Sequence, residues 1–290
     1  MARHTESRRL GWALAISIAY FFDELIAGFL TNSLALLSDA GHMLSDVGAL
    51  ALSLFAFRMA RRPANHHTTF GFHRVEILAA LFNGLTLWLI VGVIFAAAYQ
   101  RIFDPPVVES YGMMIVAILG LVVNIVAAAI LHAGHRHNLN MRGAFLHVVS
   151  DAIGSVGAIA AGAIMLTTGW YLADPLISVF ISALILYSSW SLVKDSLSVL
   201  MQAVPKGIRL EEVRETIEAV DGVHKVHDLH IWAVTSDIFT LSAHAVVENG
   251  GDFHQVLNDI EDTLKQRFNI EHTTIQLETE SREDKEFKAF

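Results

Sequence analysis

The sequence predicts six transmembrane α-helices followed by a small α+β cytoplasmic domain. Two observations lead to this fold class. Hydrophobic residues make up 53% of the 290 residues and charged residues only 17%, which is too apolar for an ordinary soluble protein. The charge is also uneven, because 18 of the 29 acidic residues but only 9 of the 20 lysines and arginines lie from Pro205 onward. We therefore divide the chain into a membrane domain over 1–204, a cytoplasmic domain over 205–280 and a charged tail over 281–290.

Six stretches of the membrane domain approach the roughly 20 apolar residues that a helix needs to cross a bilayer. The predicted transmembrane helices run over 10–31, 35–57, 75–99, 111–132, 143–168 and 172–193. The first stretch follows three arginines, as in a signal peptide, but it is long enough to span and is interpreted as the first membrane helix. Lysine and arginine gather before it, between the second and third stretches, and after the sixth. The positive-inside rule then places both termini in the cytoplasm, and in a bacterium this multi-pass protein would lie in the inner membrane.

After Pro205 the pattern becomes that of a water-soluble domain. Helical spacing with a charged face covers 208–220 and 253–268. The segments 223–234 and 238–247 are rich in β-formers, and 273–279 alternates as a strand does. The order α-β-β-α-β predicts a small open sheet with helices on one face.

The most informative motif is a pentapeptide that occurs twice inside apolar stretches. Its copies are His42-Met43-Leu44-Ser45-Asp46 and His147-Val148-Val149-Ser150-Asp151. Ionisable residues are costly in a membrane helix and usually mark a substrate path. Residues four positions apart share one helix face, so each copy presents an imidazole and a carboxylate together. Two nitrogens and two oxygens are the donors of a tetrahedral zinc site, and the chain has no cysteine to supply a thiolate instead.

The topology predicts how the two copies meet. The second helix runs inward and the fifth outward, so the copies are antiparallel and each His is expected level with the Asp of the other copy. Zinc bound to two carboxylates and two neutral imidazoles would be formally neutral, which suits apolar surroundings. Without the metal, protons should replace it at least in part, because burial and like charge disfavour two ionised carboxylates. Such an exchange is what a metal/proton antiporter requires.

Other interpretations explain less of this pattern. Buried polar residues can simply join helices, which would account for one His or Asp but not for a duplicated pair. A zinc hydrolase typically carries His-Glu-x-x-His, and the chain has no such motif, so we expect a secondary active transporter and not an enzyme. The alternative function is a membrane-anchored metal-sensing or signalling protein, although anchoring alone does not require ionisable residues at bilayer depth.

Three segments resemble motifs of the cation diffusion facilitator family, and the likeness covers nearly the whole chain. They are Ser38-Asp39-Ala40-Gly41-His42-Met43-Leu44-Ser45-Asp46, Phe70-Gly71-Phe72-His73-Arg74-Val75-Glu76 and Val226-His227-Asp228-Leu229-His230-Ile231-Trp232. The most similar branch is the zinc-transporting one, with bacterial zinc/cobalt/cadmium efflux proteins and vertebrate zinc transporters. The resemblance implies six transmembrane helices, a ferredoxin-like cytoplasmic domain, and a homodimer in the lipid bilayer that exchanges metal for protons by alternating access. We expect no nucleic-acid partner.

The resemblance also assigns the transport ligands. They fall on His42, Asp46, His147 and Asp151. This set favours Zn²⁺ over manganese or iron, with Co²⁺ and Cd²⁺ as alternative substrates. Ligand chemistry agrees, because imidazole suits zinc whereas harder ions prefer oxygen donors.

For the cytoplasmic domain the resemblance implies a second, structural or regulatory Zn²⁺ site. Its expected ligands are His227, His244, His272 and Glu278, with His254 as a further ligand. Strand alternation places His227 and His230 on opposite faces, so both are not expected to serve one ion. Some bacterial members bind two ions here, but Gln276 stands where they have a histidine, which argues against a binuclear site.

The loop between the second and third helices carries His66, His67 and His73. The resemblance implies a metal at this loop in some members, and His73 matches best; for the other two a solvated loop is equally expected. Certain members also join the start of the third helix to the end of the sixth by a basic-acidic pair. Arg74 supplies the base but Met201 stands at the acid's position, so either Asp195 substitutes for that acid or the pair is absent.

Overall fold

The computed structural model describes residues 18–132, 139–235, 238–249 and 251–280. The chain forms two compact units. The first comprises Met1–Leu52 and Phe82–Leu192, and the second comprises Ser53–Leu81 and Val193–Phe290. The loop between the second and third helices therefore belongs to the same unit as the C-terminal domain. The predicted tail over 281–290 lies outside the described residues.

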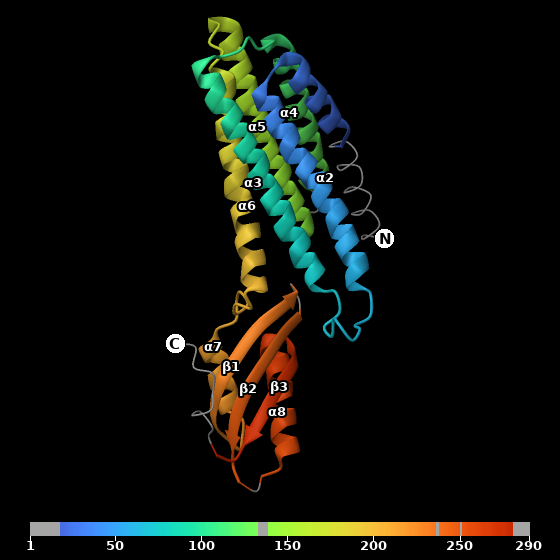
Figure 1. The fold of residues 1–290 in the computed structure, drawn as a ribbon, viewed down its shortest axis with the longest axis vertical. Coiled ribbons are helices and arrows are strands. Elements are labelled where there is room, and N and C mark those ends of the chain that lie inside the picture. The colour runs from blue at the N-terminus through green and yellow to red at the C-terminus, as the bar shows by residue number, and fades with distance from the viewer. Residues whose placement is uncertain (1–17, 133–138, 236–237, 250, 281–290) are drawn as a thin grey trace. The chain divides into compact units, whose positions relative to one another are not determined.

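Long helices precede the C-terminal domain. Residues 18–31 are helical, and five longer helices follow: α2 Leu34–Ala60, α3 Arg74–Phe103, α4 Ser110–His132, α5 Leu139–Thr168 and α6 Ala173–Leu200 (Figure 1). Each of these five is long and apolar enough to cross a membrane. They correspond to five of the six predicted spans. Only part of the first expected span, 10–31, lies within the described residues, so the number six stays a prediction.

Helix α6 is longer than the sequence pattern indicated. The expected span ended at 193, before Lys194 and Asp195, whereas the helix continues to Leu200. Hydropathy marks where a helix leaves the apolar layer, not where it ends, and lysine is a good helix former. The additional turns belong to the second unit.

Small residues allow close packing of the helices in the first unit. A Cβ at Gly41 of α2 would collide with Ile90 of α3, and one at Gly157 of α5 would collide with Ile177 of α6. The hydroxyl oxygens of Ser38 and Ser182 are 2.9 Å apart and join α2 to α6. Close approach and interhelical hydrogen bonds are how membrane helices associate, because lipid provides no hydrophobic drive between them.

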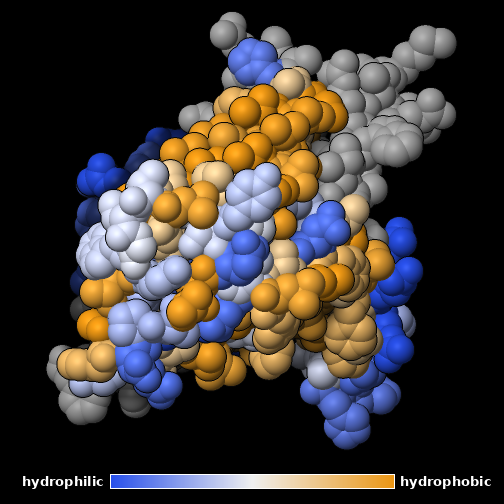
Figure 2. Space-filling model, turned by 90° about the horizontal axis from the view of Figure 1, so that it is seen from above, coloured by the Kyte–Doolittle hydropathy of each residue, from blue (hydrophilic) through white to orange (hydrophobic). Residues whose placement is uncertain are grey.

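Large hydrophobic side chains lie on the outside of the helices. Phe29 and Leu89 are each 70% exposed, and broad hydrophobic areas (orange) cover much of the face drawn in Figure 2. Contiguous apolar surface of this kind is unfavourable in water and mixes freely with lipid tails. The exposed surface therefore agrees with a helical domain inserted in a membrane.

The buried carboxylate of Asp174, at the start of one helix, binds groups at the ends of two others. Asp174, in the first turn of α6, is fully buried and accepts hydrogen bonds from Ser33 Oγ at 2.7 Å and from the backbone N–H groups of Leu34 at 2.8 Å and Ala35 at 3.2 Å. Arg101 Nη1, at the end of α3, lies 3.3 Å from Asp174 Oδ2. The first N–H groups of a helix lack partners within it. Asp174 therefore caps the start of α2 from another helix.

The C-terminal domain has the predicted order of elements: α7 Leu210–Glu218, β1 Val223–Thr235, β2 Ile238–Val247, α8 Phe253–Phe268 and β3 Ile270–Glu278. Strand β2 is central, antiparallel to β1 and parallel to β3. Both helices contribute to one hydrophobic core with the sheet, for example through Ile217 of α7 and Leu264 of α8. A three-stranded α/β domain results.

Local chemistry sets the bounds of α8 and β3. Asp252 is the N-cap of α8 and accepts hydrogen bonds from the backbone N–H groups of His254 and Gln255. Asn269, with φ 55°, ends the helix in the left-handed conformation that asparagine tolerates. The chain then enters β3 at once, and Ile270 is fully buried. This strand begins three residues before the predicted start, because tertiary burial and not alternation determines its first residue.

Candidate metal sites

Helices α2 and α5 bring together three of the four residues of the predicted transport site. His42 Nε2 lies 3.6 Å from Asp46 Oδ2 on its own helix and 3.7 Å from Asp151 Oδ1 on α5. The contact with Asp151 is the one that antiparallel copies of the pentapeptide predict. His147 belongs to α5, one turn before Asp151, but its side chain lies outside the described residues.

The three side chains are partly buried and chemically suited to a metal. The exposed fractions are 14% for His42, 17% for Asp151 and 35% for Asp46. An imidazole nitrogen and two carboxylate oxygens are donors that zinc accepts. A divalent cation would offset the two negative charges, which are costly at bilayer depth without a partner. The arrangement of donors can hold a cation.

Polar groups on neighbouring helices support the two motifs. Ser45 Oγ donates a hydrogen bond to Asn83 Oδ1 of α3 at 3.0 Å. Ser155 Oγ of α5 donates to the backbone carbonyl of Asp151 at 3.1 Å, and Asn124 Nδ2 of α4 lies 3.4 Å from Ser155 Oγ. Asn83 and Ser155 lie outside the repeated pentapeptide, so the motif did not reveal them. Their only sequence signal is a polar residue in an apolar stretch.

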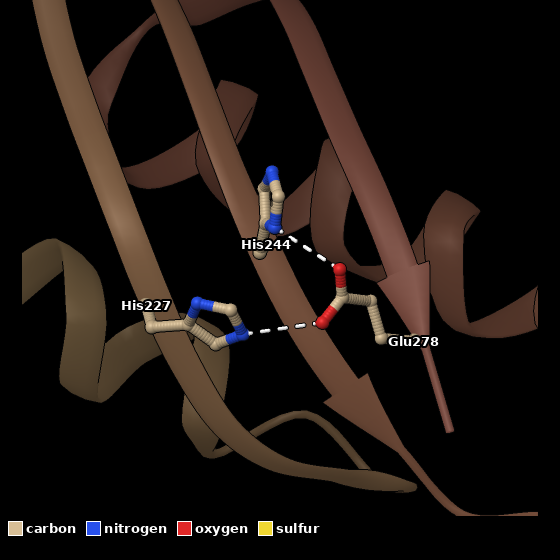
Figure 3. Close-up of side chains that lie close together, drawn as sticks. All are labelled: His227, His244 and Glu278. Atoms are coloured by element: carbon tan, nitrogen blue, oxygen red, sulfur yellow. Dashed lines mark ion pairs between the residues drawn. The ribbon is translucent and has the colours of Figure 1, made fainter. Parts of the chain in front are cut away.

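In the C-terminal domain, three side chains from three strands converge on one point (Figure 3). His227 Nε2 of β1 is 3.4 Å from Glu278 Oε2, and His244 Nδ1 of β2 is 3.1 Å from Glu278 Oε1. The candidate donor atoms all lie within 4.8 Å of one another. The side chains of His227 and Glu278 are 5% and 3% exposed, and that of His244 is 28% exposed. Two imidazoles and one carboxylate are a donor set that zinc accepts, so the residues fit this metal and leave a coordination position open.

Strand register explains why these three residues meet. His227 pairs with His244 across β1 and β2, and Glu278 pairs with Val246, two residues beyond His244. His272 pairs with Thr240 and lies six residues before Glu278 on the same strand, about 20 Å away along it. The structure therefore does not bring His272 to this cluster. His254, exposed in the first turn of α8, does not join the cluster within this chain either.

A bulge separates His227 from His230. The register of β1 shifts between these residues, and Asp228 between them has φ 47°. The side chain of His230 is 65% exposed and lies 2.9 Å from Asp228 Oδ1. His230 therefore faces solvent, away from the cluster, and Asp228 Oδ2 lies 4.0 Å from His244 Nε2. Gln276, at the position discussed for a second ion, donates instead to Glu278 Oε1 at 2.6 Å.

Two predicted ligands line one pocket elsewhere in the second unit. His73 of the α2–α3 loop and His272 of β3 both line a pocket of about 290 Å³ within the second unit. The ring of Phe70 packs edge-on against His272, with centroids 5.4 Å apart. Glu76 Oε2 accepts a hydrogen bond from Thr235 Oγ1 at 2.8 Å nearby. His66 and His67 are exposed and do not line this pocket.

The alternative acid for a basic-acidic pair at the end of α6 is engaged elsewhere. Asp195 Oδ1 lies 2.6 Å from Lys206 Nζ, eleven residues later in the chain. Among the described ion pairs, none joins Asp195 to Arg74. The described residues therefore favour the other alternative, that this basic-acidic pair is absent within one chain.

Comparisons with known proteins agree along nearly the whole sequence. A family model described as the cation efflux transmembrane domain matches residues 12–201, and a second, described as the cytoplasmic domain of cation efflux proteins, matches residues 205–280. A cadmium, cobalt and zinc/H(+)-K(+) antiporter of Bacillus subtilis (strain 168) is 47% identical over 267 residues, which is 90% of this chain and 86% of that protein.

Two further relatives point the same way. The metal cation efflux system protein CzcD of Cupriavidus metallidurans is 44% identical over 272 residues, covering 93% of this chain and 86% of that protein. The zinc transporter ZitB of Escherichia coli (strain K12) is 40% identical over 275 residues, covering 94% and 87%. Among solved structures, the metal-bound C-terminal domain of CzcD from Cupriavidus metallidurans is 40% identical and covers 24% of this chain and 99% of that chain, with a TM-score of 0.24.

Proposed function

This chain belongs to the cation efflux family, and we propose that it is a zinc/proton antiporter that exports zinc from the cytoplasm. The observation that carries the proposal is His42 Nε2, placed between Asp46 and Asp151 of two different helices. A metal held by residues of two helices is released when the helices shift relative to each other, which is what alternating access needs. With six spans, both termini lie in the cytoplasm, and in a bacterium the protein sits in the inner membrane.

The donor set and the relatives both support zinc as the substrate. His147 completes a set of two imidazoles and two carboxylates, which suits Zn²⁺ and also Co²⁺ and Cd²⁺ better than ions that prefer oxygen alone. The relatives are named for transport of zinc, cadmium and cobalt. Protons compete with the metal for all four ligands, so release of zinc at one side favours protonation there.

A homodimer is the proposed functional form, because the family model that matches residues 205–280 is that of the dimerisation domain (ZT_dimer) of cation efflux proteins. The cluster of His227, His244 and Glu278 would hold a resident zinc ion in each copy. That ion would cross-link the three strands, and its open position would accept water or a further ligand. His73 and His272 form a candidate loop site in their shared pocket.

A membrane-anchored metal sensor is the second candidate, and the cytoplasmic cluster favours it. A sensor, however, leaves the grouping of His42, Asp46 and Asp151 without a role. A measurement of zinc flux distinguishes the two functions, because only a transporter moves zinc across the membrane.

We expect zinc to accumulate against its gradient in liposomes that contain the purified protein when a pH gradient provides the driving force. Accumulation should collapse when a protonophore dissipates that gradient, because proton flow then no longer drives the exchange. The measurement is zinc-dye fluorescence inside the liposomes, with protein-free liposomes as the control and a potassium gradient as a separate arm. Zinc transport that does not depend on the pH gradient would contradict proton antiport. The absence of any zinc transport would favour the sensor.

Full-length Asp151→Ala protein should retain zinc at the cytoplasmic cluster after dialysis, and adding Glu278→Gln should remove that zinc. The glutamine keeps the size of the side chain but is a much weaker zinc ligand than a carboxylate. Bound zinc per chain is measured by atomic absorption. The control is His224→Ala, which removes an exposed histidine of β1, three residues before His227. Equal zinc contents with and without Glu278→Gln would rule out this cluster as the retained site.

A further inference from the structure

A carboxyl group with no metal-binding assignment lies deep in the first unit. Glu24, on the helix over residues 18–31, is 1% exposed, and Asp39, on α2, is 7% exposed. The two carboxyl groups lie close enough to interact directly with each other. Among the described residues, Tyr20 and not a side chain of the proposed transport site donates a hydrogen bond to Glu24.

The Glu24 carboxyl group has fewer hydrogen-bond donors around it than an ionised carboxylate needs. Tyr20 Oη is 3.0 Å from Glu24 Oε1 and 3.3 Å from the backbone carbonyl of Val116 on α4, and its single hydroxyl hydrogen serves one of them at a time. Glu24 Oε2 is buried and receives no hydrogen bond from any N–H or O–H group of the described residues. An ionised carboxylate only accepts hydrogen bonds. Two ionised carboxylates would therefore repel each other here and leave Glu24 Oε2 without a donor, whereas one proton held by the pair supplies the missing hydrogen.

The surroundings are built to hold this arrangement. Gly120 of α4 lies directly against the Tyr20 hydroxyl, and a Cβ there would collide with it. Glycine at this position lets Tyr20 reach Glu24. Two adjacent ionised carboxylates in such a buried place would suffer both desolvation and repulsion. A shared proton removes both costs.

The pair also lies within electrostatic reach of the transport site. Asp39 is one turn before His42 on α2, so the two share a face of the helix. The charged or titratable groups that act on the pair are Tyr20 from its own helix, His42 and Asp46 from α2, and Asp151 from α5. On α4 the pair meets the Val116 carbonyl and Gly120. A divalent cation among His42, Asp46 and Asp151 would favour the ionised form of Asp39, and loss of that cation would favour the protonated pair.

We propose that Glu24 and Asp39 form a proton-binding site, separate from the metal ligands, that releases its proton when metal occupies the transport site and regains it when the metal leaves. The ligand is a proton, and the proposal rests on the zinc/proton exchange proposed above. The exchanged proton is then held by a carboxyl group that does not bind the metal, so no metal ligand has to release it. Glu24 is the member of the pair that lies farther along the chain from the metal ligands, so it can be altered without removing one.

The test compares Glu24→Gln with Asp23→Asn in the full-length protein. Glutamine keeps the shape of Glu24 but cannot release a proton, whereas Asp23 is the neighbouring acid on the same helix and is exposed. Three quantities are measured: the infrared carbonyl band of protonated carboxylic acids, the protons released per zinc bound in weakly buffered detergent solution, and zinc transport in liposomes. Cytoplasmic metal sites contribute equally in both variants and in the wild type.

We expect wild type and Asp23→Asn to show a protonated-carboxyl band that zinc abolishes. Glu24→Gln should lose this band, release fewer protons per zinc, and fail to accumulate zinc in response to a pH gradient. It should still bind zinc and let zinc equilibrate down its own gradient. This separation of zinc movement from proton movement supports the proposal, because a merely structural role would weaken both together.

Other results overturn it. Unchanged proton release and pH-driven accumulation in Glu24→Gln would mean that the protons travel elsewhere, and loss of zinc binding would make Glu24 a support of the metal site. If potassium but not zinc removes the protonated-carboxyl band of the wild type, the Glu24–Asp39 pair is a monovalent-cation site instead. If wild type moves no zinc, the antiporter function itself fails, which Glu24→Gln does not decide.

Discussion

Asp151→Ala is expected to abolish proton-coupled zinc transport. The substitution removes a carboxylate that faces His42 across the α2–α5 interface, so the remaining donors on α2 have no described partner carboxylate on α5. Changes one layer outside a metal's ligands already cost about 10–100-fold in affinity, so loss of a ligand is expected to cost at least about 100-fold. The protein should still fold, because alanine favours the helix and a buried charge is removed.

Zinc flux in liposomes is the measurement, and His42→Ala, Asp46→Ala and His147→Ala are expected to give the same loss. Asp23→Ala is the control, because it deletes an exposed acid from a neighbouring apolar helix. Gel filtration and helical circular dichroism establish that each variant is folded. Transport that persists in all four ligand variants would show that the duplicated pentapeptide is not the transport site.

The arrangement of the proposed transport site could largely be predicted from the sequence. The repeated pentapeptide placed His and Asp on one helix face, and the order of spans made the copies antiparallel. From these two facts alone the contact of His42 with Asp151 could be predicted, and the structure has that contact. Periodicity likewise predicted every element of the C-terminal domain, with errors of three residues or fewer at the starts of helices and strands.

Contacts that depend on register or on tertiary burial could not be predicted in this way. His272 was expected beside Glu278, but the parallel pairing of β2 with β3 places it next to Thr240, at the other end of the strand. Alternation predicts which face a residue occupies but not how far along the sheet it lies. The buried pair of Glu24 and Asp39 could not be predicted either, because nothing in the spacing of two acids on different helices indicates that they lie together.

The role of Asp174 is a further example, and it leads to the second large effect. In the sequence, Asp174 is only an acid beside Pro175 near the start of the predicted span over 172–193. The structure makes it the cap of α2 and the ion-pair partner of Arg101. Its side chain is fully buried, whereas that of Arg101 is 18% exposed. A charge pair this well buried cannot lose one member without leaving the other poorly compensated.

Asp174→Ala is therefore expected to destabilise the protein by about 3–5 kcal/mol, the usual range for breaking a buried ion pair. Two backbone N–H groups of α2 and Ser33 Oγ lose an acceptor, and Arg101 keeps only its hydrogen bonds to Asn32. The thermal midpoint in detergent should fall by about 10 °C if it scales as in soluble proteins of this size. The matched control is Asp104→Ala, an exposed acid soon after Arg101.

Combining Asp174→Ala with Arg101→Ala separates the two contributions. If the ion pair dominates, the double variant should be little less stable than either single one, whereas an independent cap contribution should persist in the arginine-free background. Transport should fall with stability, because His42 lies only about 12 Å along α2 from its capped start at Leu34. The cap thus helps to position the helix that carries two of the proposed metal ligands. An unchanged midpoint in Asp174→Ala would mean that α2 is held in place by packing alone.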